Sequence, residues 1–162
     1  MNNIKKLEDL VRHIQGVQDN CLLLGKRLIE NGEFELARTL IANSMQHDAS
    51  KFRGIEWDYF GESNVGGDML IHAVKQHNRT NPHHPEYWTE NGGIHKMPKV
   101  YLLEMICDWK QRSSEFGTSL IEYIDLNATN RFSFTKDDAV YQTIIHYVNM
   151  ILDKPFKPMK QS

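Results

Sequence analysis

A histidine followed directly by an aspartate, His47-Asp48, is the pair best suited to chemistry in this sequence. Neighbouring residues of a helix point about 100° apart, so their side chains meet on one object only if it lies between them. A divalent metal ion has the right size, and imidazole with carboxylate suits Zn, Mn, Fe or Co. The pair also has a simpler interpretation, as a surface pair or a contact at a helix end.

Other residues that can bind metal are spread along the chain, and they are rich in histidine. The sequence has eight histidines, four of which lie between residues 72 and 84. The further candidates are His13, His77, His83, His84 and Asp108. The remaining histidines are expected to be structural or at the surface: His72, His95 and His146.

Length and composition limit the class of protein. The 162 residues are enough for one domain with a real core, which we place at residues 3–152, followed by an extended tail. The net charge of −2 makes a strongly electrostatic nucleic-acid binder unlikely. No signal-peptide core and no apolar run of about 20 residues is present, so we expect a cytoplasmic protein without membrane contact. The cysteines Cys21 and Cys107 are expected to be buried free thiols.

Hydrophobic spacing predicts an all-α, single-domain helical bundle. Apolar residues recur every three or four positions in several segments, and no segment has the alternation of a strand. Helices are expected over residues 3–30, 33–47, 68–78, 98–116, 118–125 and 136–152. The other segments are expected to be irregular or short-helical (50–67), a loop (127–133) and an extended tail (154–162).

These helices would position the candidate ligands. His13 lies beside Ile14, at the edge of the apolar face of the first helix, and His47-Asp48 ends the second helix. His77 is expected on the same inward face as Ala73. His83 and His84 belong to a loop stiffened by two prolines, and Asp108 lies beside the apolar stripe of a later helix.

Several of these residues keep a second interpretation. Asp108 could pair with Arg112 four residues later, and His77 could be a core histidine with its hydrogen bonds satisfied. His83 and His84 could be loop scaffolding, and Lys51 could be a solvated lysine. Four aromatic residues are expected in the core rather than as a platform for nucleobases: Trp57, Tyr87, Trp88 and Trp109.

The order of these motifs resembles the HD superfamily of metal-dependent phosphohydrolases. His-Asp-x-Ser-Lys-Phe, then His-x3-Asn-Pro-His-His-Pro-Glu-Tyr-Trp and Glu-Met-x-x-Asp-Trp are more closely similar to an HD-like family common in phages and bacteria, which brings no known substrate. The resemblance covers about residues 10–125. It implies an HD-domain-like bundle in which four residues bind one divalent ion: His13, His47, Asp48 and Asp108.

The resemblance implies hydrolysis of a nucleotide or related phosphate ester. The ion (Mn, Co, Zn, Mg or Fe) would activate a water molecule, and Asp48 or Glu86 would take its proton. His77 and one of the two loop histidines would face Asp48 and bind a second ion or the substrate phosphate. The residues expected to contact that phosphate are Lys51, His77, Arg79, His83 and His84.

Two other functions remain open at this stage. HD proteins with extra histidines include di-iron oxygenases, which iron content and a phosphatase screen would distinguish. The protein could instead be a binding module in which the metal only stabilises the helical bundle. Such an ion has no open coordination position. The oligomeric state cannot be inferred from the sequence.

Overall fold

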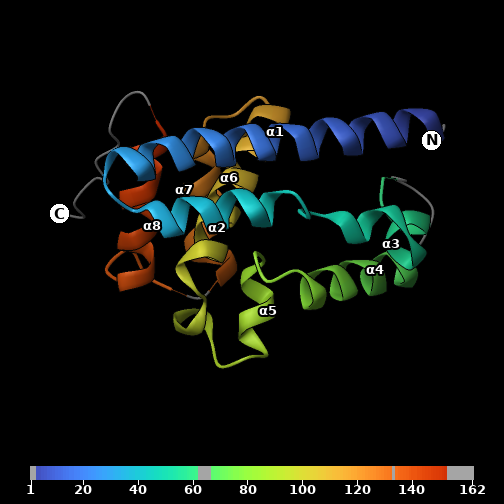
Figure 1. Cartoon of the computed structure of the whole chain (residues 1–162). Helices are drawn as coiled ribbons and strands as arrows, with labels where there is room; N and C mark the ends of the chain where they lie inside the picture. Colours follow the sequence, from blue (N-terminus) through green and yellow to red (C-terminus); the bar gives the residue numbers. More distant parts are fainter. Residues whose placement is uncertain (1–2, 62–66, 133, 153–162) are drawn as a thin grey trace.

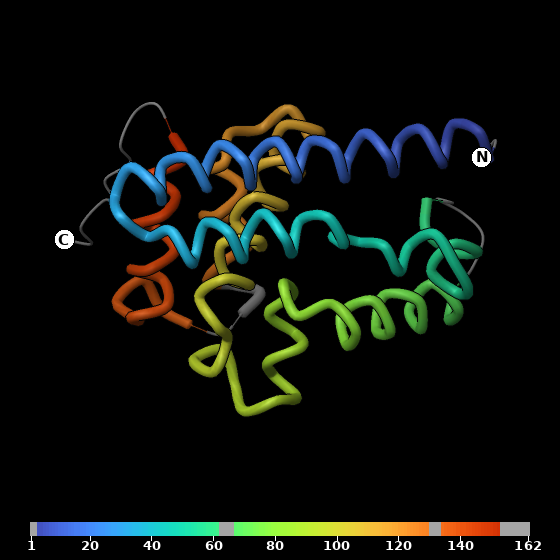
Figure 2. Tube along the Cα trace, in the orientation of Figure 1, coloured from blue at the N-terminus to red at the C-terminus, as the bar shows by residue number. Residues whose placement is uncertain are grey.

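Helix α1 (Asn3–Glu30) extends along one side of the molecule, and α2 (Phe34–Ser44) returns antiparallel beside it (Figure 1). The structure, a computed structural model, describes residues 3–61, 67–132 and 134–152. A two-residue turn at Asn31 and Gly32 joins the two helices, with Gly32 at a φ of 81°. After α2 the chain crosses to the far end of the molecule, as the tube in Figure 2 shows.

The described residues contain only helices, which confirms the all-α prediction. Eight are α-helices, and two short elements are 3₁₀-helices, η1 and η2. The elements after α2 are η1 (Ala49–Phe52), α3 (Gly54–Tyr59), α4 (Gly67–Thr80), α5 (Pro85–Thr89), η2 (Ile94–Lys96), α6 (Lys99–Glu115), α7 (Leu120–Phe132) and α8 (Ala139–Ile151).

Helix α6 forms the centre of the bundle. Eight consecutive residues, Leu102 to Trp109, are buried, so this helix is enclosed on all its faces there. It packs against α1, α2, α7 and α8, whose apolar residues form one core cluster with it. The sequence predicted only one apolar stripe on this helix. Full enclosure means that the polar residues Glu104 and Asp108 are buried as well.

The N-terminal half of α1 does not bury the face that its apolar spacing predicted. Ile4 and Leu7 are 65% and 45% exposed, whereas Lys6 and His13 are buried. The buried face turns toward polar residues of other helices in this half, and from Val17 on it is apolar except for Asn20. The helix is continuous from Asn3 to Glu30, and Gly25 packs closely against Ile41 of α2.

Several predicted boundaries need correction. Helix α2 ends at Ser44, so His47 and Asp48 lie in the turn that follows rather than on the helix. Helix α7 continues through most of the segment predicted as a loop at 127–133. Helix α8 begins at Ala139, because Asp138 caps it by accepting a hydrogen bond from the Val140 backbone N–H at 2.8 Å. The predicted tail at 154–162 lies outside the described residues.

None of the helices in the described ranges combines the length and apolar character needed to cross a membrane.

Candidate metal centre

The two carboxylate oxygens of Asp48 face two different groups of histidines. Its Oδ2 lies 3.5 Å from Nε2 of His13 and 3.6 Å from Nε2 of His47. His13 Nε2 is also 3.2 Å from Oδ1 of Asp108. His13, His47 and Asp108 have donor atoms within 4.8 Å of one another, so these three and Asp48 surround one point. The structure therefore brings together the four residues that the sequence singled out.

A second group surrounds the other oxygen of Asp48. Oδ1 lies 3.2 Å from Nε2 of His77 and 3.5 Å from Nε2 of His83. His84 joins them, with its Nε2 2.9 Å from His77 Nε2. Asp48, His77, His83 and His84 offer donor atoms within 4.8 Å of one another. We expected only one of the two loop histidines here, and the structure places both.

The backbone at Asp48 makes this arrangement possible. Asp48 has a φ of 55°, the only positive φ of a non-glycine residue in the described part of the chain. Asp tolerates this left-handed conformation better than most residues, at a cost of about 1–2 kcal/mol. This turn lies between α2 and η1, and it directs the Asp48 side chain inward, between α1, α4 and α6. A turn, not the firm helix end we expected, holds the pair.

Three inward histidines, His13, His47 and His77, are each fixed from behind by a buried or partly buried glutamate. Nδ1 of His13 donates to Glu115 at 2.8 Å, Nδ1 of His47 to Glu104 at 2.9 Å, and Nδ1 of His77 to Glu56 at 2.7 Å. Glu104 Oε1 also lies 3.4 Å from Nδ1 of His83. A carboxylate only accepts hydrogen bonds, so each Nδ1 carries the proton and each Nε2 is directed at the centre. Metal-binding histidines in proteins are oriented in this way.

Buried atoms of the centre lack hydrogen-bond partners. Within the described residues these atoms are Nε2 of His13, His47 and His83, together with Oδ1 of Asp48 and Asp108. Buried polar atoms nearly always have a partner, because leaving one unsatisfied costs about 1–3 kcal/mol. The nitrogen and oxygen donors suit a divalent ion such as Zn, Mn or Fe. These buried clusters could hold a metal ion.

The electrostatics of the centre keep its two carboxylates ionised. Burial raises the pKa of Asp48, but Lys51 and His47 outweigh it and hold that pKa well below 3.8. Burial likewise opposes ionisation of Asp108, but its 3.2 Å contact with His13 and the charge of His47 lower its pKa below the ordinary range. Both side chains are therefore anionic.

The histidines divide into two kinds. Burial lowers the pKa of His13, but Asp108 and Asp48 outweigh it and raise that pKa to about 9. The pKa values of His47 and His77 are raised in the same way against the effect of burial. Burial and the charge of His47 lower the pKa of His83 to about 4. Burial, together with the neighbouring His83 and His77, lowers the pKa of His84. The loop histidines are thus neutral, the form that binds a metal.

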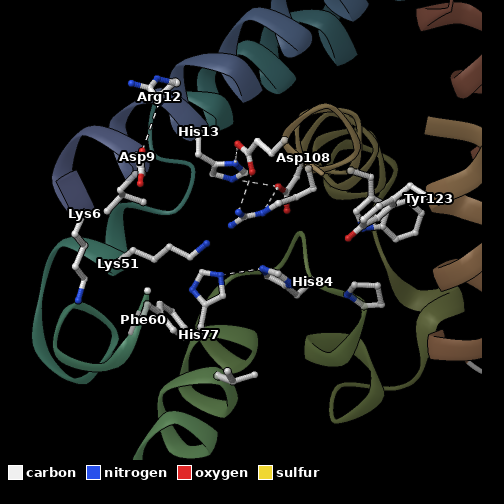
Figure 3. A pocket seen from close by; sticks show the side chains of 17 residues that line it. Lys6, Asp9, Arg12, His13, Lys51, Phe60, His77, His84, Asp108 and Tyr123 are labelled. Carbon is white, nitrogen blue, oxygen red and sulfur yellow. Dashed lines mark hydrogen bonds and ion pairs between the residues drawn. The ribbon is translucent and has the colours of Figure 1, made fainter. Parts of the chain in front are cut away.

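The centre opens into a pocket of about 640 Å³. Figure 3 shows His13 and Asp108 on one side of this pocket and His77 and His84 on the other, with the Lys51 side chain reaching between them. Four cationic residues line it: Lys6, Arg12, Lys51 and Arg112. This is the size of pocket that binds small molecules. Three acidic residues line it beside these cations: Asp9, Asp108 and Glu115. A second pocket of about 370 Å³ reaches His47, His83 and Glu104.

Of the residues predicted to bind phosphate, Lys51 fits best. Its Nζ lies 2.5 Å from Oδ2 of Asp48, and the side chain lines the pocket. Arg79 does not fit, because it lies two positions after the inward His77, on the opposite face of α4. Its side chain is 61% exposed and forms ion pairs with Glu90, at 3.0 Å for the closest contact.

Glu86 does not lie where a proton acceptor for the centre was expected. Its Oε2 is 4.0 Å from Nδ1 of His84, on the side of that ring turned away from His77, and Glu86 does not line the pocket. Asp108 has no close pairing with Arg112, whose Nε is 4.0 Å away, and instead faces His13.

Only part of the aromatic prediction is correct. Trp109 is buried in the core and Trp88 packs against it partly buried, whereas Trp57 and Tyr87 are partly buried and do not belong to the core cluster. Cys21 and Cys107 are buried and free. His72, His95 and His146 are exposed.

Residues 2–154 match a family model described as "Family of unknown function (DUF5662)". The chain belongs to this family. The curated proteins and the solved structures that were compared gave no match. The family description names no activity, so the function of this DUF5662 member has to be inferred from its site.

Sequence reasoning did not identify the glutamates that fix the histidines. Glu104 and Glu115 of this family member lie four before and seven after Asp108, on one face of α6, so their spacing was a usable signal. Glu56 lies in the short helix α3, where no pattern points to it. The pocket residues Lys6, Arg12, Phe60 and Tyr123 also had no signal, because they come from three different segments.

Proposed function

We propose that this protein is a divalent-metal-dependent phosphohydrolase that acts on a nucleotide or related phosphate ester. The observation that carries the proposal is the arrangement around Asp48, whose two oxygens face two groups of inward Nε2 atoms at the base of a pocket lined by both cationic and acidic side chains. The sequence resemblance to the HD superfamily supports the same activity. The residues and their order agree with it.

His13, His47, Asp48 and Asp108 would hold one ion. His77, His83 and His84 would hold a second, with Asp48 as the carboxylate shared between them. A bound divalent ion lowers the pKa of a water molecule and stabilises the charge of a phosphoryl group. The donor set suits Mn, Fe, Co or Zn better than Mg, which prefers oxygen ligands.

The protein's own residues would do the rest of the chemistry. Lys51 and Arg112 line the pocket next to the centre and would bind the phosphate oxygens. Glu115, Glu104 and Glu56 would keep the imidazoles in position. Asp48 and Asp108, both anionic, are the groups in reach that can accept the proton lost by the attacking water.

The pocket favours catalysis over the two alternatives. A metal that only stabilised the bundle would not need to be reachable from a pocket. Here the pocket is lined by His13, His77, His84 and Asp108. A di-iron oxygenase would use a similar donor set, but four cationic side chains around the opening suit an anionic phosphate. Iron analysis together with a phosphatase screen separates these functions.

The test is metal-dependent phosphate release. Purified protein is analysed for bound metals and assayed on a nucleotide panel with Mn, Co, Zn or Mg added. Asp48→Asn keeps the shape of the residue and tolerates the left-handed backbone. We expect this variant to lose metal and activity, while the exposed control Asp58→Asn keeps both. Wild-type activity in folded Asp48→Asn would refute the proposal.

A further inference from the structure

The pocket continues beyond the metal centre in two directions. Figure 3 shows Phe60 and Lys6 at one end and Tyr123 at the opposite end, with His13, Asp108 and His84 between them. The chain segments agree, because Phe60 directly follows α3 at the far end of the bundle whereas Tyr123 belongs to α7 near α6. The centre therefore lies in the middle of the pocket rather than at a closed end.

Each end has an aromatic side chain next to one of the two ligand groups. The Phe60 ring lies 5.6 Å from the ring of His77, edge to face, and Lys51 Nζ lies 5.8 Å from its centroid. At the other end Tyr123 lies 6.2 Å from Trp109, the residue after Asp108. Phe60 and Tyr123 are both partly buried, so each presents part of its ring to the pocket.

The cationic side chains of the pocket do not all lie at its two aromatic ends. Lys51 and Arg112 lie near the centre, where the side chains contact or approach Asp48 and Asp108. Lys6 lies at the Phe60 end, and its ammonium donates to the backbone carbonyl of Trp57. These two cations are paired with Asp48 and Glu115, so an anionic group that links two rings would bind them together with the metal, with an aromatic wall on either side.

We propose that the substrate is a phosphodiester joining two nucleosides, that is, a linear dinucleotide. This proposal rests on the proposed function and specifies its substrate class. A phosphomonoester has one organic arm and would fill only one end of the pocket. Bases stack on aromatic side chains whatever their identity, so the pocket would tolerate several base sequences.

The reaction is a balanced hydrolysis. A bond forms between phosphorus and the oxygen of water, and the bond from phosphorus to one nucleoside oxygen breaks. The departing oxygen takes a proton, so the products are one nucleoside monophosphate and one nucleoside. No oxidant, reductant or second substrate is needed.

The experiment measures binding and turnover separately. Isothermal titration with a non-hydrolysable dinucleoside methylenephosphonate is compared with titration of the nucleoside monophosphate, at the same metal concentration. We expect the dinucleoside compound to bind at least about tenfold more tightly, since one stacked base contributes about 1–3 kcal/mol. Phe60→Ala and Tyr123→Ala should each weaken its binding about tenfold. The exposed control Phe34→Ala should have no effect.

The nucleoside monophosphate best distinguishes a pocket filled at one end from a pocket filled at both ends. It should lose affinity in only one of the two aromatic variants, because it fills one end of the pocket. Equal affinity for the two compounds, or unchanged dinucleoside binding in both variants, would overturn the proposal. Tighter binding of a hexanucleotide with a steep loss of affinity in salt would also overturn it, because that outcome indicates a nucleic-acid strand.

The outcomes for the two proposals are distinguishable. If mononucleotides are hydrolysed with a higher kcat/KM than dinucleotides, the dinucleotide inference fails while metal-dependent hydrolysis stands. If the dinucleoside compound binds as expected but no phosphate ester is hydrolysed with any metal, the proposed function fails and the recognition of two nucleosides stands.

Discussion

Glu104 is the residue that connects the two groups of histidines. Its Oε1 accepts from Nδ1 of His47 at 2.9 Å and lies 3.4 Å from Nδ1 of His83. We expect Glu104→Gln to weaken metal binding by about 10- to 100-fold, because both imidazoles lose their anionic partner. Metal titration by calorimetry measures the effect, and circular dichroism verifies the fold. The exposed control Glu30→Gln should titrate like the wild type, and an unchanged affinity in Glu104→Gln would mean that the histidines are held by packing alone.

Lys51 has a different role, since it contacts Asp48 from the pocket side. We expect Lys51→Ala to lower kcat/KM by about a hundredfold through loss of a charged donor to the phosphate. Lys51→Arg should recover part of that loss, since it keeps the charge. Steady-state kinetics with metal content measured in parallel provides the check. A loss of bound metal as large as the loss of activity would show that Lys51 supports the centre rather than the substrate.

At the scale of single residues, the sequence identified the candidate metal ligands but not the residues that surround them. His13, His47, Asp48 and Asp108 were identifiable because the order of their motifs resembles that of the HD superfamily. Arg79 was misplaced because it lies two positions after His77, and two positions along a helix reverse the direction of a side chain. The pocket lining could not be predicted, since it depends on how several segments pack.

At the scale of the helices, α8 depends on its cap. Asp138 accepts from the Val140 backbone N–H at 2.8 Å and contacts Nε2 of His95 at the same distance. We expect Asp138→Ala to lower the thermal midpoint by a few degrees, because a buried-core helix loses its N-terminal hydrogen bond. Thermal unfolding followed by circular dichroism measures the shift.

The pH dependence of the stability lost in Asp138→Ala follows from the same contacts of Asp138. The Val140 N–H and His95 lower the pKa of Asp138 below its ordinary value of 3.8. A lowered folded-state pKa contributes stability above the unfolded value, and this contribution disappears as the pH falls through the folded value. The difference between wild type and Asp138→Ala should therefore be constant near neutral pH and shrink below about pH 4. A difference that persists at pH 2 would exclude the charged cap as its cause.

Helix existence was predictable from spacing, whereas helix ends and faces were not. The range 3–30 was correct because its periodicity is long. The end of α2 was placed at residue 47 because no residue type in Met45, Gln46 and His47 disfavours a helix. In the structure their backbone N–H groups bond three residues back instead of four, so the α-helix ends at Ser44. The face of α1 was misjudged in its first half because the side toward the centre must carry Lys6 and His13, so Ile4 and Leu7 turn outward.

At the scale of the whole molecule, the enclosed helix α6 ties the centre to folding. Asp108 and Glu104 lie within its buried run, between residues of the main core. A metal held there is bound by the folded protein and not by the unfolded chain. Metal at about 100 times its dissociation constant should raise the free energy of unfolding by about 2.7 kcal/mol. Denaturant unfolding with and without metal measures this increase.

The enclosure of α6 also determines how its amide protons exchange with solvent deuterium. No local opening exposes a helix surrounded on every face, so amides from Leu102 to Trp109 should exchange only when the whole domain unfolds. Metal should then slow all of them by the same factor, about a hundredfold at the concentration above, including those that are far from any ligand. Amides in the first turn of α4, which exchange by fraying, should keep their rates. Mass spectrometry of deuterium uptake would thus detect an ion at the centre as a uniform change along one helix.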